Sequence, residues 1–153
     1  MVLAAPALAG VSVYRPMDPV SHLRRKVLPI LQAYAQQLRA EHPDLNINVY
    51  DWSVGDRTDW QGHAIGLECL IGDAMPELPD NVALAVELCH LHKTPKISSA
   101  DVTWGHPSGH IEAELLADPI RFSPESLTEI VDRLPELFIA LQQAVRRGQP
   151  PAK

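Results

Sequence analysis

The chain has 153 residues, the size of one ordinary domain, and 46% of them are hydrophobic while 21% are charged. This composition excludes a disordered or fibrous protein, and no apolar stretch reaches the roughly 18 residues that a membrane-spanning helix needs. The formal net charge is −6, and the acidity is concentrated in residues 43–81, which hold eight acidic residues against one arginine. Such a surface disfavours nucleic acid and favours a basic or mixed-charge protein as the partner.

The sequence predicts one domain between two short terminal segments. Residues 1–18 are interpreted as a flexible N-terminal extension, residues 19–148 as a single domain and residues 149–153 as a tail.

Cys69 and Cys89 each lie in an apolar run, so we expect two buried thiols, with a disulfide between neighbouring strands as the alternative. Free thiols suit a reducing compartment, which favours a cytoplasmic location.

The first predicted element is an amphipathic helix of about five turns, because apolar residues recur at spacings of three and four. They are Leu23, Val27, Leu31, Tyr34 and Leu38. Ser21 is the predicted N-cap, and His42 with Pro43 should end the helix. Pro29 lies inside this stripe and lacks a backbone donor, so we expect either a kink there or a helix that begins nearer to it.

Residues 45–116 change to a period of two, which is typical of half-buried strands. Five strands are predicted, at residues 45–52, 63–71, 82–92, 97–104 and 110–116. Polar segments with Gly or Pro separate them, among them a loop at residues 55–62 and a hairpin turn at residues 105–109. Because most connections are short, consecutive strands should run antiparallel as a meander.

A second amphipathic helix closes the predicted domain. Ser123 is its expected N-cap with Pro124 in the first turn, Gly148 should end it, and Pro135 implies a kink or two consecutive helices. The predicted fold is therefore α+β: a five-stranded, mainly antiparallel meander with an N-terminal and a C-terminal amphipathic helix packed on one face.

The segment from Asp51 to Trp60 has the most unusual composition in the chain, since it places two tryptophans among three aspartates and one arginine. Its spacing matches neither a calcium loop nor a phosphate-binding loop. Aromatic anchors with a charged rim are typical of protein-binding hot spots. The predicted binding residues are Trp52, Asp56, Arg57, Asp59 and Trp60. The alternative is that both tryptophans pack back onto the domain.

Three histidines form a candidate metal or acid–base site. In a meander, His63, His90 and His92 fall at one end of the sheet, near Asp56 and Asp59. Burying the apolar residues of the second and third strands on one face sets His63 opposite His90 or His92. Imidazoles at the rim of the core would suit zinc or a general base. The alternative is that these histidines are packing residues satisfied by backbone groups and water.

Three functions from different classes are compatible with these features. The leading prediction is a small protein-binding module, in an inhibitor, immunity-like or adaptor role, that docks a basic or mixed-charge protein through the Asp51–Trp60 segment. A metal-assisted hydrolase using the histidines and zinc is the alternative, although an enzyme is not favoured because no dinucleotide, nucleophile-elbow or His-Glu-His motif is present. The second alternative is a self-associating structural protein. Its interface would be the sheet face of Ala64, Leu70, Ala83, Ala85 and Cys89.

Overall fold

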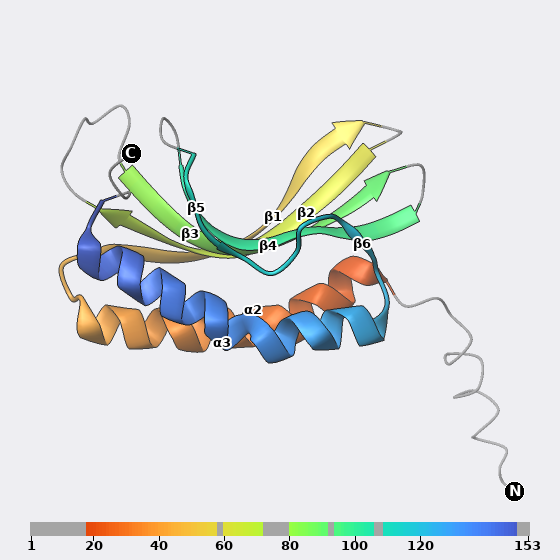
Figure 1. Cartoon of the computed structure of the whole chain (residues 1–153). Helices are drawn as coiled ribbons and strands as arrows, with labels where there is room; N and C mark the ends of the chain where they lie inside the picture. Colours follow the sequence, from red (N-terminus) through yellow and green to blue (C-terminus); the bar gives the residue numbers. More distant parts are fainter. Residues whose placement is uncertain (1–17, 58–59, 72–79, 92–93, 106–108, 150–153) are drawn as a thin grey trace, which may run out of the picture.

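The computed structural model describes residues 18–57, 60–71, 80–91, 94–105 and 109–149, with the backbone only for residues 54–57, 60–61, 80 and 90–91. In chain order the elements are helix α2 (Pro19–Glu41), strands β1 (Asn46–Arg57), β2 (Trp60–Ile71), β3 (Asp80–Leu91), β4 (Thr94–Trp104), β5 (Ile111–Glu114) and β6 (Ile120–Arg121), and helix α3 (Pro124–Arg147). Figure 1 shows one sheet with both helices on the same side of it.

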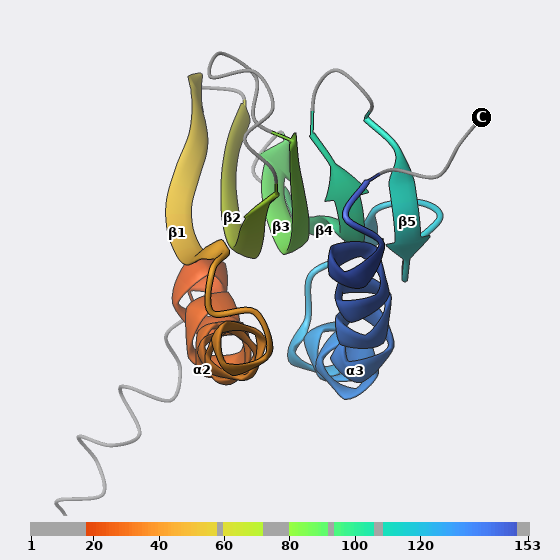
Figure 2. The same ribbon diagram turned by 90° about the vertical axis from the view of Figure 1, so that its left-hand side faces the viewer.

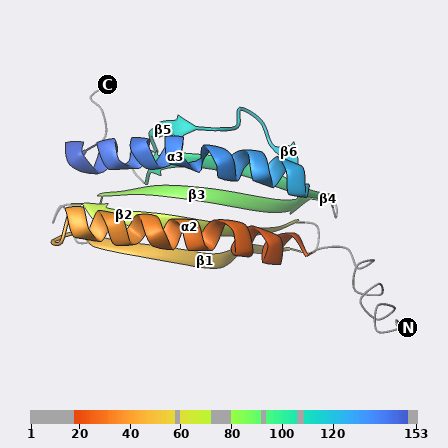
Figure 3. The ribbon, with the colours of Figure 1, turned by 90° about the horizontal axis from the view of Figure 1, so that it is seen from below.

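One antiparallel sheet forms the centre of the fold. Its strand order is β1-β2-β3-β4-β5, a meander, and the two-residue strand β6 pairs with β4. The predicted α+β fold, with a five-stranded meander and both helices on one face, is confirmed (Figures 2 and 3). The sequence does not predict β6, because two residues are too few to show a period.

Helix α2 begins earlier than predicted. Asp18 is its N-cap, since the side chain accepts a hydrogen bond from a backbone N–H of the first turn. The assignment of the cap to Ser21 is therefore wrong, whereas the end at His42 is confirmed. The helix also runs through Pro29, so the expected later start is wrong. Pro29 is exposed, and water can satisfy the carbonyl that lacks its usual donor there.

Helix α3 matches the prediction at both ends. The Ser123 hydroxyl accepts a hydrogen bond from the backbone N–H of Ser126, and the Ser126 hydroxyl accepts one from the backbone N–H of Ser123. Gly148 ends the helix with φ 75°, a left-handed conformation that glycine adopts without strain. The helix continues past Pro135, so the alternative of two consecutive helices is wrong.

The hairpin of β1 and β2 replaces the loop that was predicted at residues 55–62. β1 continues to Arg57 and β2 begins at Trp60, and the strands stay paired along this length apart from a bulge between Val54 and Asp56. Backbone pairing does not require apolar side chains, so a strand that is polar on both faces shows no alternation in its sequence. The Asp51–Trp60 segment is thus mainly strand rather than loop.

The helix-covered face of the sheet carries the hydrophobic core. Leu67, Leu84 and Val86 are fully buried there, as are Leu31 of α2 and Leu134 of α3. The predicted inward faces of the strands and the apolar stripes of both helices are therefore confirmed. None of the described helices is long and apolar enough to cross a lipid bilayer.

The two cysteines are both free thiols, so the alternative of a disulfide between them is wrong. Cys69 is buried on the helix-covered face and pairs with Val82, whereas Cys89 is half-buried and pairs with Gly62. Burial, with a smaller contribution from Glu68, raises the pKa of the Cys69 thiol to about 12. Such a thiol stays protonated and acts as a small apolar side chain.

Candidate functional site

The face of the sheet opposite the helices is covered by none of the described elements, and Figure 1 shows the strands curving away from the helices on this side. We call it the uncovered face. Small residues of β2 and β3 occupy its middle. They are Gly62, Ala64, Gly66, Ala83 and Ala85. β1 contributes Tyr50 and Trp52 on one side of them, and β4 contributes Ser99 and Asp101 on the other. An aromatic side and a polar side therefore flank a strip of small residues.

Tyr50 and Trp52 form the aromatic side of the uncovered face. Their ring centroids lie 4.4 Å apart with an angle of 25° between the planes, a stacked pair. Tyr50 pairs with Gly66 across the strands, and a Cβ on Gly66 would come within 2.2 Å of Cζ of Tyr50. Glycine at this position is what allows the tyrosine ring to lie across β2. Trp52 remains 52% exposed, so a large aromatic ring is held on a paired strand and still faces solvent.

Carboxylates gather beside this aromatic pair. Burial raises the pKa of Tyr50 to about 12, and the negative charges of Glu68, Glu87 and Asp101 add to the shift. Burial likewise raises the pKa of Asp101 to about 6, with further contributions from Glu87 and Glu114. No salt bridge in the described part of the chain involves any of these four carboxylates. The uncovered face therefore concentrates negative charge across four neighbouring strands, β2 to β5.

A polar cluster lies on the other side of the same hairpin, beneath β1. His63 is only 6% exposed; its Nε2 is hydrogen-bonded to a carboxylate oxygen of Asp51, and its Nδ1 lies 3.4 Å from the hydroxyl oxygen of Ser53. Nε of Arg24, on α2, donates to the same carboxylate at 2.6 Å. The Arg24 guanidinium, supported by His63, holds the pKa of Asp51 below its ordinary value.

This cluster links α2 to the hairpin rather than forming a nucleophilic site. Ser53, His63 and Asp51 are the residue types of a serine nucleophile, but Ser53 lies within a regular strand instead of on the sharp strand-to-helix turn that exposes such a nucleophile. Arg24 is exposed on α2, and its guanidinium still reaches the Asp51 carboxylate. A charged hydrogen bond between α2 and β1 stabilises their packing.

The five predicted binding residues have different outcomes. Trp52 lies on the uncovered face and is exposed, as a binding residue requires. Asp56 pairs with Gln61 and Arg57 with Trp60 at the end of the hairpin, where only the backbone is described. Asp59 lies outside the described residues. The binding role of all five residues stays a prediction.

The histidine site differs from the prediction in its register. Leu88, rather than His90 or His92, lies opposite His63, and His90 pairs with Gln61. The predicted face is correct, but burial of one face fixes only the parity of the register, and the pairing is displaced by two residues or more. Within the described residues no three His, Cys, Asp or Glu side chains are grouped to hold a metal ion. His92 lies outside those residues, so zinc binding stays a prediction.

Sequence reasoning did not identify Tyr50, Glu68, Glu87 and Asp101 as one group. Period-two alternation places each of them away from the apolar face of its own strand, which is the available signal. Only the register shows that they are neighbours across strands, because they come from β1, β2, β3 and β4.

No protein-family model matches the chain, and neither the curated proteins nor the solved structures searched contain a match. Only the residues of the site itself therefore indicate a function.

Proposed function

We propose that the protein is a small binding module that docks a basic segment of a partner protein on its uncovered face. The observation that carries this proposal is the stack of Tyr50 and Trp52 beside a group of carboxylates on the same face. An aromatic ring attracts a cation through its quadrupole, and a carboxylate accepts two hydrogen bonds from a guanidinium. An arginine side chain uses both kinds of contact, so arginine is the residue that this surface fits best.

The charge of the uncovered face supports a basic rather than an acidic partner. The raised pKa of Asp101 has burial as its first cause, and repulsion from Glu87 adds to it. A bound cation would offset that repulsion and favour the ionised carboxylates. The net charge of the whole chain, −6, adds long-range attraction that speeds the encounter with a basic protein.

The exposed ring of Trp52 supplies the anchor that such interfaces use. Tryptophan is enriched among the few residues that contribute most of the binding free energy, and it does so when its ring is held in place before the partner arrives. Stacking on Tyr50 holds it here. We place this module in the cytoplasm, which its two free thiols favour, in an inhibitor, immunity-like or adaptor role.

The test is direct binding of a fluorescein-labelled peptide of about nine residues in which Arg alternates with Thr, measured by fluorescence anisotropy. The same peptide with Glu in place of Arg is the charge control. We expect the arginine peptide to bind the wild type and the glutamate peptide not to bind. Trp52→Ala and the double variant Glu87→Gln/Asp101→Asn should each weaken binding by about tenfold or more.

A matched variant separates the uncovered face from net charge alone. Glu129→Gln/Asp132→Asn removes one glutamate and one aspartate from exposed positions of α3 and changes the net charge by the same amount. It should bind the arginine peptide within about twofold of the wild type. The proposal fails if the arginine peptide does not bind, or if the α3 variant loses as much affinity as the variant of the uncovered face.

A further inference from the structure

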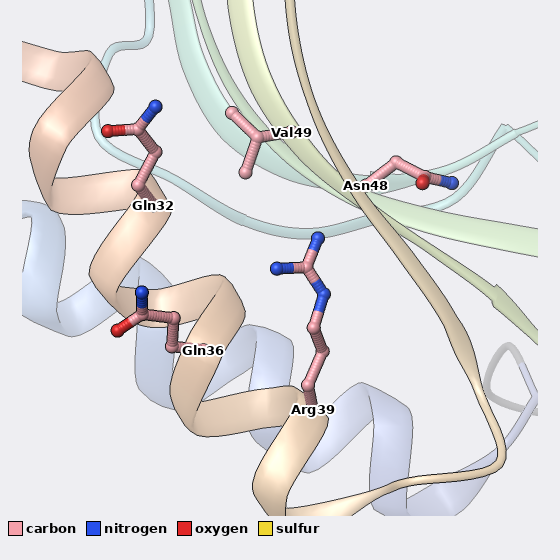
Figure 4. A pocket seen from close by; sticks show the side chains of 5 residues that line it. All are labelled: Gln32, Gln36, Arg39, Asn48 and Val49. Carbon is pink, nitrogen blue, oxygen red and sulfur yellow. The ribbon is translucent and has the colours of Figure 1, made fainter.

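Strand β1 forms one edge of the sheet, and helix α2 runs alongside it (Figures 2 and 3). Between them lies a cleft with a volume of about 410 Å³. It is lined by Gln32, Gln36, Arg39, Asn48 and Val49. Figure 4 shows the Arg39 side chain directed toward the strand, with Gln32 and Gln36 farther along α2. The cleft thus combines the edge of a strand with polar side chains from a helix.

The contact between Arg39 and β1 shows which backbone groups face outward. Nη2 of Arg39 donates to the carbonyl oxygen of Ile47 at 2.8 Å, so this carbonyl points away from β2. The N–H and C=O of one strand residue point to the same side, and the side alternates along the strand. Val49 and Asp51 therefore also direct their N–H and C=O outward. In the described part of the chain, β1 pairs with β2 alone, so no strand meets these groups.

The volume of the cleft is large enough for part of an added strand. A residue in a sheet occupies roughly 160 Å³, given a rise of about 3.4 Å, a strand spacing of about 4.8 Å and a layer thickness of about 10 Å. A cleft of about 410 Å³ therefore has room for two or three residues. Val49 and the residues next to it span that length of β1.

We propose that the basic segment binds in an extended conformation, as an additional antiparallel strand on the open edge of β1. This inference rests on the proposed function and specifies how the partner lies. Strand addition gives affinity through backbone hydrogen bonds and specificity through alternate side chains. Here the backbone of the added strand pairs with Val49 and Asp51, and Arg39 marks where the free edge begins, because it already occupies the Ile47 carbonyl.

The two faces of the sheet then define the sequence pattern of the partner. Residues opposite Tyr50 and Trp52 share their face, and side chains directly opposed across strands lie about 4.5–5.5 Å apart at Cβ. Arginine at these positions stacks on the aromatic pair. Residues opposite Val49 and Asp51 face the flank of α2, where Gln32 and Gln36 favour small polar side chains. The partner segment therefore alternates basic and polar residues.

The charges distinguish a foreign segment from a second copy of this chain. If β1 of another copy occupied the edge, its described side chains on the uncovered face would be Asn46, Asn48, Tyr50 and Trp52, and none of these is basic. The carboxylates would then gain no counter-charge. A basic segment brings positive charge to the same face, where the nearest of these carboxylates, Glu68, lies on β2, so the edge is assigned to a partner of that chemistry.

Backbone methylation of the Arg-Thr peptide tests the strand directly. In antiparallel pairing the residues opposite Val49 and Asp51 exchange both hydrogen bonds with them, and in this peptide they are the threonines. Methylating the threonine nitrogens should weaken binding by about tenfold or more, because it removes donors to β1. Methylating the backbone nitrogens of the arginines should change the affinity by about twofold at most, because these backbone N–H groups point away from β1.

Hydrogen exchange followed by NMR adds a readout on the protein itself. The amides of Val49 and Asp51 should exchange rapidly in the free protein and slow markedly when the Arg-Thr peptide is bound. Equal binding of both methylated peptides, with no protection of these amides, would overturn strand addition and leave the proposed function intact. Absence of binding by the unmethylated peptide would instead reject the proposed function, and with it this inference.

A variant of the edge completes the test. Val49→Pro removes an outward N–H, a position where an edge strand accommodates proline, while Val49→Thr keeps both the N–H and the β-branched shape. We expect the peptide to bind the threonine variant like the wild type and the proline variant about tenfold more weakly, with thermal unfolding confirming that both are folded. Protection of Val49 and Asp51 without peptide, together with a doubled mass in sedimentation, would assign the edge to a second copy and contradict the proposal.

Discussion

The two faces of the sheet differ in everything except their backbone. On the face under the helices, residues such as Leu67 and Leu84 are fully buried and apolar. On the uncovered face, small residues separate the Tyr50–Trp52 stack from Asp101, and Trp52 remains half exposed. The same hydrogen-bonded ladder supports both, so the contrast is a property of the side chains alone.

This contrast separates stability from binding. The covered face removes large apolar side chains from water, which is the main source of folding free energy. The uncovered face instead keeps an aromatic ring in solvent and brings carboxylates close together, and neither feature favours the folded state. Side chains that do not favour folding, gathered on one surface, are typical of a functional site. Substitutions should therefore have opposite consequences on the two faces.

The largest effect is expected in the core. Leu67→Ala should lower the free energy of unfolding by about 2–5 kcal/mol, because it leaves a cavity between the sheet and the helices. Ile111→Ala, on the uncovered face at a residue that is 50% exposed, should lower it by only about 0.5 kcal/mol. Urea denaturation measures both values. Similar losses for the two variants would contradict the division of the sheet into a core face and a binding face.

An intermediate effect is expected where the aromatic pair crosses β2. Gly66→Ala should lower the free energy of unfolding by about 1–3 kcal/mol, because its Cβ would meet the ring of Tyr50. The displaced ring should also change the near-ultraviolet circular dichroism that arises from its stack on Trp52.

A double-mutant cycle is the control for this clash. Tyr50→Ala vacates the space, so Gly66→Ala should be much less destabilising when Tyr50→Ala is already present. If the two substitutions are additive, the ring does not lie across Gly66 as described.

Much of this fold is predictable from local chemistry. The N-cap Ser123 and the end at Gly148 are correct because caps depend on a few adjacent residues. The inward faces of the strands are correct because alternation of apolar residues decides which face is buried. The meander is correct because short connections leave consecutive strands little choice but to run antiparallel.

The candidate site was predictable only in part, because it depends on register. Trp52 is identified by the composition of its segment, and the sequence predicts its charged neighbours within the same hairpin. The described carboxylates of the uncovered face instead come from distant positions such as Glu87 and Asp101. The same two-residue ambiguity separated His63 from its predicted partner His90. Parity follows from burial, whereas the exact pairing follows from loops whose geometry the alternation does not contain.

The smallest expected effect on the free energy of unfolding concerns Asp101. It is also the most specific test of the difference between the two faces of the sheet. The pKa of Asp101 is raised to about 6 from an ordinary value of 3.8, so between these values the folded protein holds a proton that the unfolded chain has released. As the pH rises from about 4 to about 6, ionisation of Asp101 should lower the free energy of unfolding of the wild type. Asp101→Asn has no carboxyl to ionise at this position and should not show this decrease. We expect the variant to be more stable than the wild type by about 1 kcal/mol above pH 6 and equal to it below pH 4.

Denaturation of both proteins from about pH 4 to about pH 8 measures this difference, with the exposed Asp132→Asn as the control that should show no such dependence. If Asp101→Asn is less stable than the wild type at neutral pH, a favourable partner stabilises the Asp101 carboxylate. The negative charge of the uncovered face would then not be uncompensated. A stabilised variant that also binds the arginine peptide more weakly would show that this carboxylate serves binding rather than folding.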